Sequence, residues 1–254
     1  MDLGLSDRVY VVTGASRGLG RACAEQLVAE GARLVLAGRD DDALAATVAT
    51  LGGSERAIAV SGDLSQPGIE TCLVAAAVAR YGRLDGALIG VGDPAPSSVL
   101  DTDDGSWRLA FESVFLGPLR LARAVTRNVS HEGGSIVMLL STAARQPLDG
   151  AALANGLRPA MAMTAKTLAD ELGPRNVRVN AVLAGRIETD RTRAADVAGG
   201  RPDETRRANE AQIPLRRYGE PLEFARPTVF LLSPSASYVT GSLLAVDGGL
   251  ARSL

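Results

Sequence analysis

The chain has 254 residues, a length that suits one large α/β domain or two small ones. Apolar residues make up 46% of it and charged residues 22%, which allows a sizeable buried core and argues against disorder. The net charge of −2, with 27 scattered Lys and Arg residues, gives no electrostatic basis for a nucleic-acid partner.

The N-terminal residues, the two cysteines and the histidine indicate where the protein is located and whether it binds a metal ion. Residues 1–8 lack the layout of a signal peptide, and no apolar run approaches 18 residues, so we expect a cytoplasmic protein with no membrane partner. Cys23 and Cys72 fall in predicted helices, where we expect both to be small buried side chains. One histidine and no CxxC pair predict no metal site.

Short β-branched runs alternate with longer helical patterns. We predict strands at 9–12, 34–37, 57–60, 84–89, 135–140, 177–182 and 243–246. These runs are almost continuously apolar, which is typical of parallel strands that are buried on both faces. We therefore expect an α/β fold over residues 1–254, a single-domain Rossmann fold whose seven-stranded parallel sheet carries helices on both faces.

One segment, about 188–214, is rich in Arg, Asp and Ala and poor in large apolar residues. We expect a lid or substrate loop, or small helices over the active site; a solvated pair of surface helices is an equal alternative. Arginines at 186, 191, 193, 206 and 207 either recognise an acidic substrate or carrier phosphate, or form a solvated face.

A glycine-rich stretch, Thr13-Gly14-Ala15-Ser16-Arg17-Gly18-Leu19-Gly20, separates the first strand from the first helix. In this context Gly14 allows the tight turn, Gly18 lets the backbone approach a pyrophosphate, and Gly20 lets the helix pack closely on the sheet. The helix N-terminus offers free N–H groups to the anion. The sequence therefore predicts a dinucleotide phosphate site, with Ser16, Arg17 and Leu19 as further contacts.

These motifs resemble those of the short-chain dehydrogenase/reductase superfamily, from about residue 7 to residue 249. The resemblance is carried by the TGxxxGxG spacing, by Gly62-Asp63-Leu64, by Arg178-Val179-Asn180-Ala181-Val182, by Ile187 and Thr189, and by Gly241 and Val246-Asp247-Gly248-Gly249. It implies that the carboxylate of Asp63 binds the adenine and that Ile187 and Thr189 contact the nicotinamide amide and the phosphates. It also implies cofactor contacts at Leu64, Gly90 and Gly185, a small-molecule substrate, and a homodimer or homotetramer.

The end of the second strand bears on the choice of dinucleotide. Gly38 stands where the family's NAD enzymes usually carry Asp, and Arg39 follows it. Two guanidiniums, of Arg17 and Arg39, can clamp a 2′-phosphate by charge-assisted hydrogen bonds. We therefore expect NADP(H) in preference to NAD(H), although both arginines could simply face solvent, and Asp40 could reach the ribose.

The catalytic half departs from the family pattern. Ser141 ends the fifth strand, where the family's catalytic Ser lies, but the positions of its Tyr and Lys hold Ala154 and Arg158. Val114 replaces the supporting Asn, and Ile89-Gly90-Val91-Gly92 and Ala184-Gly185 replace the usual Asn-Asn-Ala-Gly and Pro-Gly. Arg158 can hold ribose hydroxyls or a substrate carboxylate, or form a structural ion pair, but it is a poor proton relay. We take Ser141, Arg158 and Asn155 as the candidate catalytic residues.

Two hypotheses follow, because the cofactor motifs match the family and the catalytic positions do not. The first is an NADP(H)-dependent oxidoreductase with a non-standard proton donor, which reduces a carbonyl or enone or oxidises an alcohol. The second is a non-redox protein of the same fold that binds dinucleotide and acts as an isomerase, cyclase, sensor or structural subunit.

Overall fold

The computed structural model describes residues 2–90 and 92–253, and within these residues seven parallel strands form one sheet in the order β3-β2-β1-β4-β5-β6-β7. The strands are β1 (Val9–Thr13), β2 (Arg33–Gly38), β3 (Ala57–Ser61), β4 (Gly86–Gly90), β5 (Gly134–Ser141), β6 (Val177–Ala184) and β7 (Leu243–Val246). Each begins and ends within two residues of the predicted run. The predicted fold class is confirmed.

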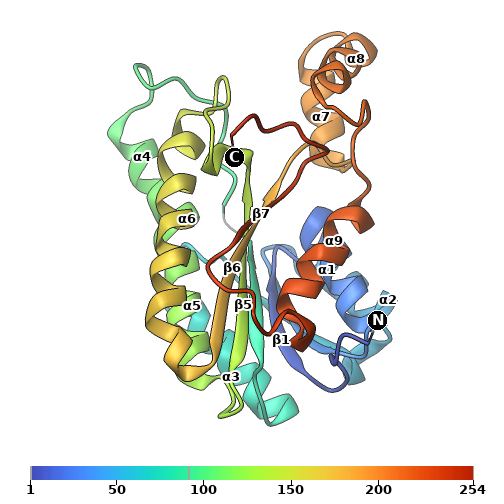
Figure 1. Ribbon diagram of the computed structural model, residues 1–254, viewed down its shortest axis with the longest axis vertical. Helices are drawn as coiled ribbons and strands as arrows, with labels where there is room; N and C mark the ends of the chain where they lie inside the picture. Colours follow the sequence, from blue (N-terminus) through green and yellow to red (C-terminus); the bar gives the residue numbers. More distant parts are fainter. Residues whose placement is uncertain (1, 91, 254) are drawn as a thin grey trace.

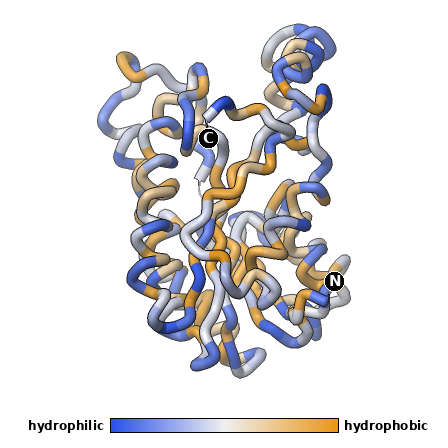
Figure 2. The backbone as a smooth tube through the Cα atoms, viewed as in Figure 1, coloured by the Kyte–Doolittle hydropathy of each residue, from blue (hydrophilic) through white to orange (hydrophobic). Residues whose placement is uncertain are grey.

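Helices cover both faces of the sheet (Figure 1). They are α1 (Gly18–Ala29), α2 (Asp41–Thr50), α3 (Ile69–Tyr81), α4 (Asp104–Phe111), α5 (Gly117–Asn128), α6 (Ala152–Leu172), α7 (Asp190–Ala198), α8 (Pro202–Gln212) and α9 (Pro221–Leu232). Side chains of β1 alternate between the two faces: Val9 and Val11 pack with α3, α5 and α6, whereas Tyr10 and Val12 pack with α1 and α9. The strands are mostly hydrophobic (Figure 2). Both faces of the inner strands are buried, whereas the edge strands β3 and β7 are partly exposed.

The strand order of the sheet has a switch point at the carboxyl ends of β1 and β4. These neighbours pair in parallel, and the chain builds the sheet outward from them in opposite directions. Ligands of open α/β sheets bind at such a switch point. The loops after β1 and β4 flank it and carry the predicted phosphate loop and the segment from Gly90 onward, of which Val91 lies outside the described residues.

Helix α6 begins earlier than the sequence predicts. We expected a start near Asn155, so that Pro159 would fall in the first turn, but the helix begins at Ala152 and Pro159 lies inside it. Ser97, in the loop after β4, accepts hydrogen bonds from the N–H groups of Ala152 (3.2 Å, to its carbonyl) and Leu153 (3.3 Å, to its Oγ). These tertiary partners fix the helix start, and the exposed proline removes one helical hydrogen bond.

The apolar face of α6 covers the chain's own sheet. Ala162, Ala165 and Ala169 are buried against the strands of the same chain.

Segment 188–214 folds as two short helices, α7 and α8, which protrude from the body of the molecule (Figure 1) and are largely hydrophilic (Figure 2). The buried carboxylate of Asp196 ties the pair to the following loop, because it accepts hydrogen bonds from Tyr218 Oη (2.9 Å) and Asn209 Nδ2 (3.1 Å). The small helices are therefore present, while their role as a lid stays a prediction.

The two cysteines differ in their exposure. Cys23 is buried as expected, but Cys72 is exposed, because α3 turns Leu73, Val74 and Ala77 toward the core instead. Among the described residues, no group of His, Cys, Asp and Glu side chains could hold a metal ion. No helix in residues 2–90 and 92–253 is both long and apolar enough to cross a bilayer.

Candidate active site

The loop between β1 and α1 has the geometry that its glycines predict. Gly14 (φ +63°) and Gly18 (φ +58°) adopt the left-handed conformation that favours glycine. A Cβ on Gly20 would lie 2.3 Å from the carbonyl oxygen of Gly14, so no larger residue fits there without moving backbone. The tight turn and the close packing of helix on loop are both present.

The N-terminus of α1 is available to a ligand. Arg17 precedes the helix with extended backbone, and no side chain among the described residues caps the first turn. A Cβ on Gly18 would lie 3.9 Å from Cγ2 of Thr189, so the segment after β6 reaches the phosphate loop. Ser16 and Leu19 are half-buried beside it. Open N–H groups at a close backbone approach suit a dinucleotide pyrophosphate, and this assignment stays a prediction.

At the end of β2, Arg39 is exposed and its guanidinium lies 3.8 Å from the carboxylate of Asp63. Arg17 is exposed as well. Asp40 instead caps α2, since its side chain accepts a hydrogen bond from the N–H of Ala43 (3.0 Å). Asp40 is therefore engaged in local structure, whereas the guanidinium of Arg39 is exposed beside the carboxylate of Asp63.

The other predicted cofactor contacts lie at the carboxyl ends of their strands. The N–H of Gly90 donates to Thr13 Oγ1 (2.7 Å), which joins the ends of β4 and β1. Gly185 packs against Asp247, whose Cα would lie 2.5 Å from a Cβ at that glycine. Ile187 is buried after β6, and Leu64 is half-buried after β3.

Ser141 and Arg158 are in direct contact. Nη1 of Arg158 donates to Ser141 Oγ (2.7 Å), and Nη2 donates to Asp93 Oδ1 (2.9 Å). The Arg158 side chain is 7% exposed. Burial lowers the pKa of its guanidinium and the neighbouring Asp93 opposes that shift, so the group stays a cation at neutral pH.

The hydrogen bonds of Ser141 leave its hydroxyl free to act only as a donor. Its Oγ accepts from Arg158 and also from the N–H of Ala143 (3.2 Å). A hydroxyl has two acceptor lone pairs and one proton, so two N–H donors occupy its acceptor capacity. The Ser141 proton is therefore the part of the group that is free to bind a ligand oxygen.

Apolar side chains surround this pair where the family pattern has Tyr and Asn. Ala154 is buried one helical turn before Arg158, on the same face of α6. Val114 is fully buried with Leu153 and Leu157, in a π-helical turn over Glu112–Leu116. Such π-helical turns often mark functional sites. In this protein the turn carries the apolar side chain of Val114.

Asn155 serves the neighbouring loop. Its Oδ1 accepts from the N–H of Leu148 (2.9 Å) and its Nδ2 donates to the carbonyl of the same residue (2.8 Å). Both ends of the amide are thus occupied by one backbone unit. The geometry favours a positioning role for Asn155 over the predicted contact with reacting atoms.

Sequence reasoning missed Asp93. Its Oδ1 binds Arg191 on α7 (2.7 Å) as well as Arg158, so it joins the base of the protruding helices to α6. The position of Asp93 could have indicated its role, because a charged residue shortly after β4 lies at the switch point of the sheet. Arg193 and Arg206 are paired with Glu188 and are already neutralised.

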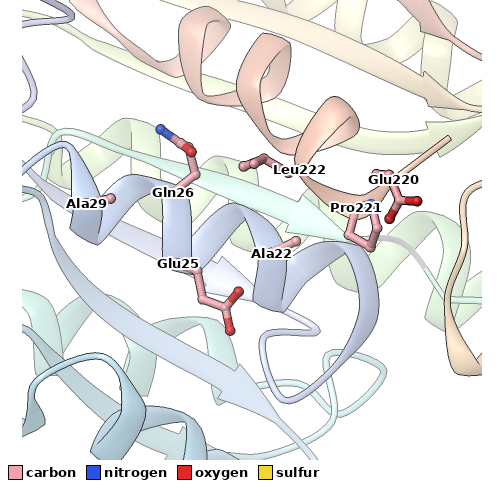
Figure 3. A pocket seen from close by; sticks show the side chains of 7 residues that line it. All are labelled: Ala22, Glu25, Gln26, Ala29, Glu220, Pro221 and Leu222. Atoms are coloured by element: carbon pink, nitrogen blue, oxygen red, sulfur yellow. The ribbon is translucent and has the colours of Figure 1, made fainter.

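A hollow of 420 Å³ lies elsewhere, between α1 and the start of α9 (Figure 3). It is lined by Ala22, Glu25, Gln26, Ala29, Glu220, Pro221 and Leu222. None of these residues belongs to the phosphate loop or contacts Ser141, so the hollow is separate from the candidate site.

Comparison with known proteins agrees with this geometry. The protein-family model described as "Enoyl-(Acyl carrier protein) reductase" matches residues 14–251. L-rhamnose 1-dehydrogenase (NAD(P)(+)) of Azotobacter vinelandii is 36% identical, covering 97% of each chain. A 3-oxoacyl-(acyl-carrier-protein) reductase of Vibrio cholerae is 30% identical, covering 98% of this chain and 99% of its own.

Among solved structures, the L-sorbose reductase of Gluconobacter frateurii, complexed with NADPH and L-sorbose, superposes with a TM-score of 0.94. It is 31% identical, and the match covers 100% of both chains. The protein therefore belongs to the short-chain dehydrogenase/reductase superfamily. It is an oxidoreductase of this class, whose members use nicotinamide dinucleotides.

Proposed function

We propose that this protein is an NADP(H)-dependent reductase of carbonyl compounds, in which Ser141 and Arg158 take over the work of the missing Tyr and Lys. The observation that carries the proposal is the hydrogen-bonding state of Ser141. With both lone pairs occupied by Arg158 and Ala143, its hydroxyl is oriented as a donor at the carboxyl end of β5.

The residues present suit a carbonyl reduction. When bound, a reduced dinucleotide would supply a hydride to the carbonyl carbon of the substrate, and the C=O electron pair would move to the substrate oxygen. Ser141 would donate its proton to that oxygen and regain one from solvent water, which leaves as hydroxide. The guanidinium of Arg158, 2.7 Å from Oγ, stabilises the negative charge that develops on the two oxygens. Preorganised positive charge of this kind typically contributes about 3–4 kcal/mol to a transition state.

Preference for NADP(H) rests on charge at the end of β2. Arg39 and Arg17 are both exposed, whereas Asp40 is engaged as the cap of α2. A 2′-phosphate offers three oxygens to such guanidiniums, whereas Asp40 is not free to bind the ribose diol of NAD(H). The NADPH complex of the L-sorbose reductase is consistent with this preference.

The proposal is tested by mixing the protein with NADPH and a panel of ketones, aldehydes and enones, and following absorbance at 340 nm. We expect NADPH oxidation with at least one carbonyl class, and a loss of about 100-fold in kcat for Ser141→Ala with little change in NADPH affinity. Ser130→Ala is the matched control, because Ser130 is also half-buried but lies in the loop between α5 and β5, at the opposite end of β5 from Ser141. Failure of the whole panel to oxidise NADPH would contradict the proposal.

A second candidate is favoured by the apolar surroundings of Ser141. Ala154 and Val114 are buried and carry no proton, and Arg158 is engaged by Asp93. Such a site suits a protein that binds dinucleotide without turning it over, or an isomerase or cyclase. Transfer of deuterium from labelled NADPH into any product would exclude this alternative.

A further inference from the structure

Two guanidiniums share one carboxylate at the centre of the candidate site. Oδ1 of Asp93 binds Nη2 of Arg158 at 2.9 Å and Nη2 of Arg191 at 2.7 Å. The formal charge of the three groups is +1. Arg158 is almost fully buried, so this excess is screened less than a surface charge would be.

The buried guanidinium also has unused hydrogen-bonding capacity. Among the described residues, Nε of Arg158 has no hydrogen-bond partner although it is shielded from solvent. A buried cation with an unmet donor is costly, and a further anion would relieve this cost. Asp93 supplies only one oxygen to the pair, and its side chain is 40% exposed, so it lies where solutes can reach it.

We propose that the site binds a small carboxylate-bearing carbonyl compound, a 2-oxo acid or the corresponding 2-hydroxy acid. Its carboxylate pairs with Arg158 and Arg191 in place of Asp93, which acts in the free protein as an internal competitor. The substrate class rests on the proposed reductase function, but binding of the anion does not.

The contact between Ser141 and Arg158 selects the 2-oxo acid. Nη1 of Arg158 and Oγ of Ser141 are 2.7 Å apart, so the donor for a carbonyl oxygen and the cation for a carboxylate are adjacent. In a 2-oxo acid the two oxygen-bearing carbons are bonded to each other, so both contacts can form together. A carboxylate also accepts two parallel N–H bonds from a guanidinium, which a single Asp93 oxygen does not.

The test uses oxamate, a non-reducible mimic of a 2-oxo acid, and its neutral ethyl ester. Binding to the full chain is measured by calorimetry and by fluorescence of Trp107, the single tryptophan, whose ring lies against Gly156 within α6. We expect oxamate to bind at least 10-fold more tightly than the ester. Asp93→Asn is expected to tighten oxamate binding about 5-fold, and Arg158→Gln to weaken it at least 10-fold.

Arg108→Gln is the matched control, because Arg108 is an exposed arginine that pairs with Asp104 on its own helix. Its oxamate affinity is expected to equal that of the unmodified protein. Equal binding of acid and ester, or weaker oxamate binding by Asp93→Asn, overturns the inference. If Arg158→Gln does not fold, Arg191→Gln replaces it, with a weakening of about 3-fold expected and no weakening counting against the site.

The two proposals fail in different ways. Arg158-dependent binding of oxamate, with no NADPH oxidation by any carbonyl compound of the panel or by any 2-oxo acid, supports the anion site and contradicts the reductase function. Reduction of neutral ketones as fast as 2-oxo acids supports the reductase function and overturns the anion site.

Discussion

Arginine at position 158 provides a geometry that lysine would not. The planar guanidinium binds Ser141 through one nitrogen and Asp93 through another, whereas an ammonium is a point charge on a flexible stem. Its charge is permanent, so it stabilises negative charge well and relays protons poorly. Alanine at position 154 has no proton to give to a substrate oxygen.

The spacing from Ser141 predicts that Ala154→Tyr with Arg158→Lys restores the family's catalytic pair. We expect the double variant to reduce generic ketones with NADPH at a rate at least 10-fold above the unmodified protein, measured at 340 nm. Each single variant serves as a control and is expected to lack this gain. A folded double variant, judged by circular dichroism, with no gain would mean that positions 154 and 158 are wrongly assigned.

Arg39→Asp addresses the dinucleotide preference. Removing a charge-assisted hydrogen bond costs about 1.5–3 kcal/mol, which corresponds to about 10- to 100-fold in Kd. We therefore expect NADPH to bind about 10- to 100-fold more weakly and NADH to bind no worse, as measured by fluorescence titration. Arg56→Asp, an exposed arginine just before β3, is the control. Unchanged discrimination between the two dinucleotides would refute the role of Arg39.

At the scale of elements, the N-termini of α1 and α9 differ in whether side chains bind their free N–H groups. The N-terminus of α1 is left without a side-chain cap, in keeping with a ligand-binding end. That of α9 is closed by Glu220 and Glu223: the carbonyl of Glu220 accepts from the N–H of Glu223 (2.9 Å), and the side chain of Glu223 accepts from the N–H of Glu220 (2.8 Å).

Gly20→Ala is expected to disrupt the α1 end. The added Cβ would meet the Gly14 carbonyl at 2.3 Å, so the loop has to move, at a cost of about 1–3 kcal/mol or more. We expect a lower Tm and at least 10-fold weaker dinucleotide binding. Gly173→Ala is the matched control, because this glycine has helical backbone (φ −52°) and nothing within 4 Å of a Cβ. Equal effects of the two substitutions would contradict the close-packing role.

The contacts of Glu223 at the N-terminus of α9 make the stability of the folded protein depend on pH. The hydrogen bonds from Arg217 lower the pKa of Glu223 from 4.5 to about 2. A depressed carboxyl pKa gives stability that is complete above pH 4.5 and is lost as the pH falls toward 2. We expect Glu223→Gln to lower the urea midpoint at pH 7 and to match the unmodified protein more closely at pH 3. A difference that does not shrink with acid would show that Glu223 acts without its charge.

For the whole molecule, the open edge of the sheet raises the question of self-association. β7 ends the strand order and carries the exposed Leu244. Met163 on α6 and Tyr238 before β7 are also exposed, at 68% and 103%. An unpaired strand edge with apolar side chains is a natural site for a second copy.

We accordingly propose a homodimer or homotetramer, and expect light scattering to give two or four times the 26.3 kDa chain mass. Met163→Glu with Leu244→Glu is expected to shift the mass toward the monomer. A monomeric mass of the unmodified protein at micromolar concentration would refute the proposal, and unchanged assembly of the double variant would move the interface elsewhere.

The sequence by itself determined the sheet and the phosphate loop. Strand burial follows from local runs of apolar residues, and the turn after β1 requires glycines at 14, 18 and 20, so both are readable in chain order. The early start of α6 was not readable, because its first N–H groups are satisfied by Ser97, some 55 residues away.

Only the tertiary structure decided how the catalytic region is arranged. Asp93, Ser141, Arg158 and Arg191 come from four separate elements, and the parallel sheet brings their strand and helix ends to one edge. The same folding gave Asp40 and Asn155 local backbone partners and turned Cys72 to solvent. Local patterns specify backbone conformation and burial, whereas the pairing of polar side chains depends on distances that exist only after the sheet has formed.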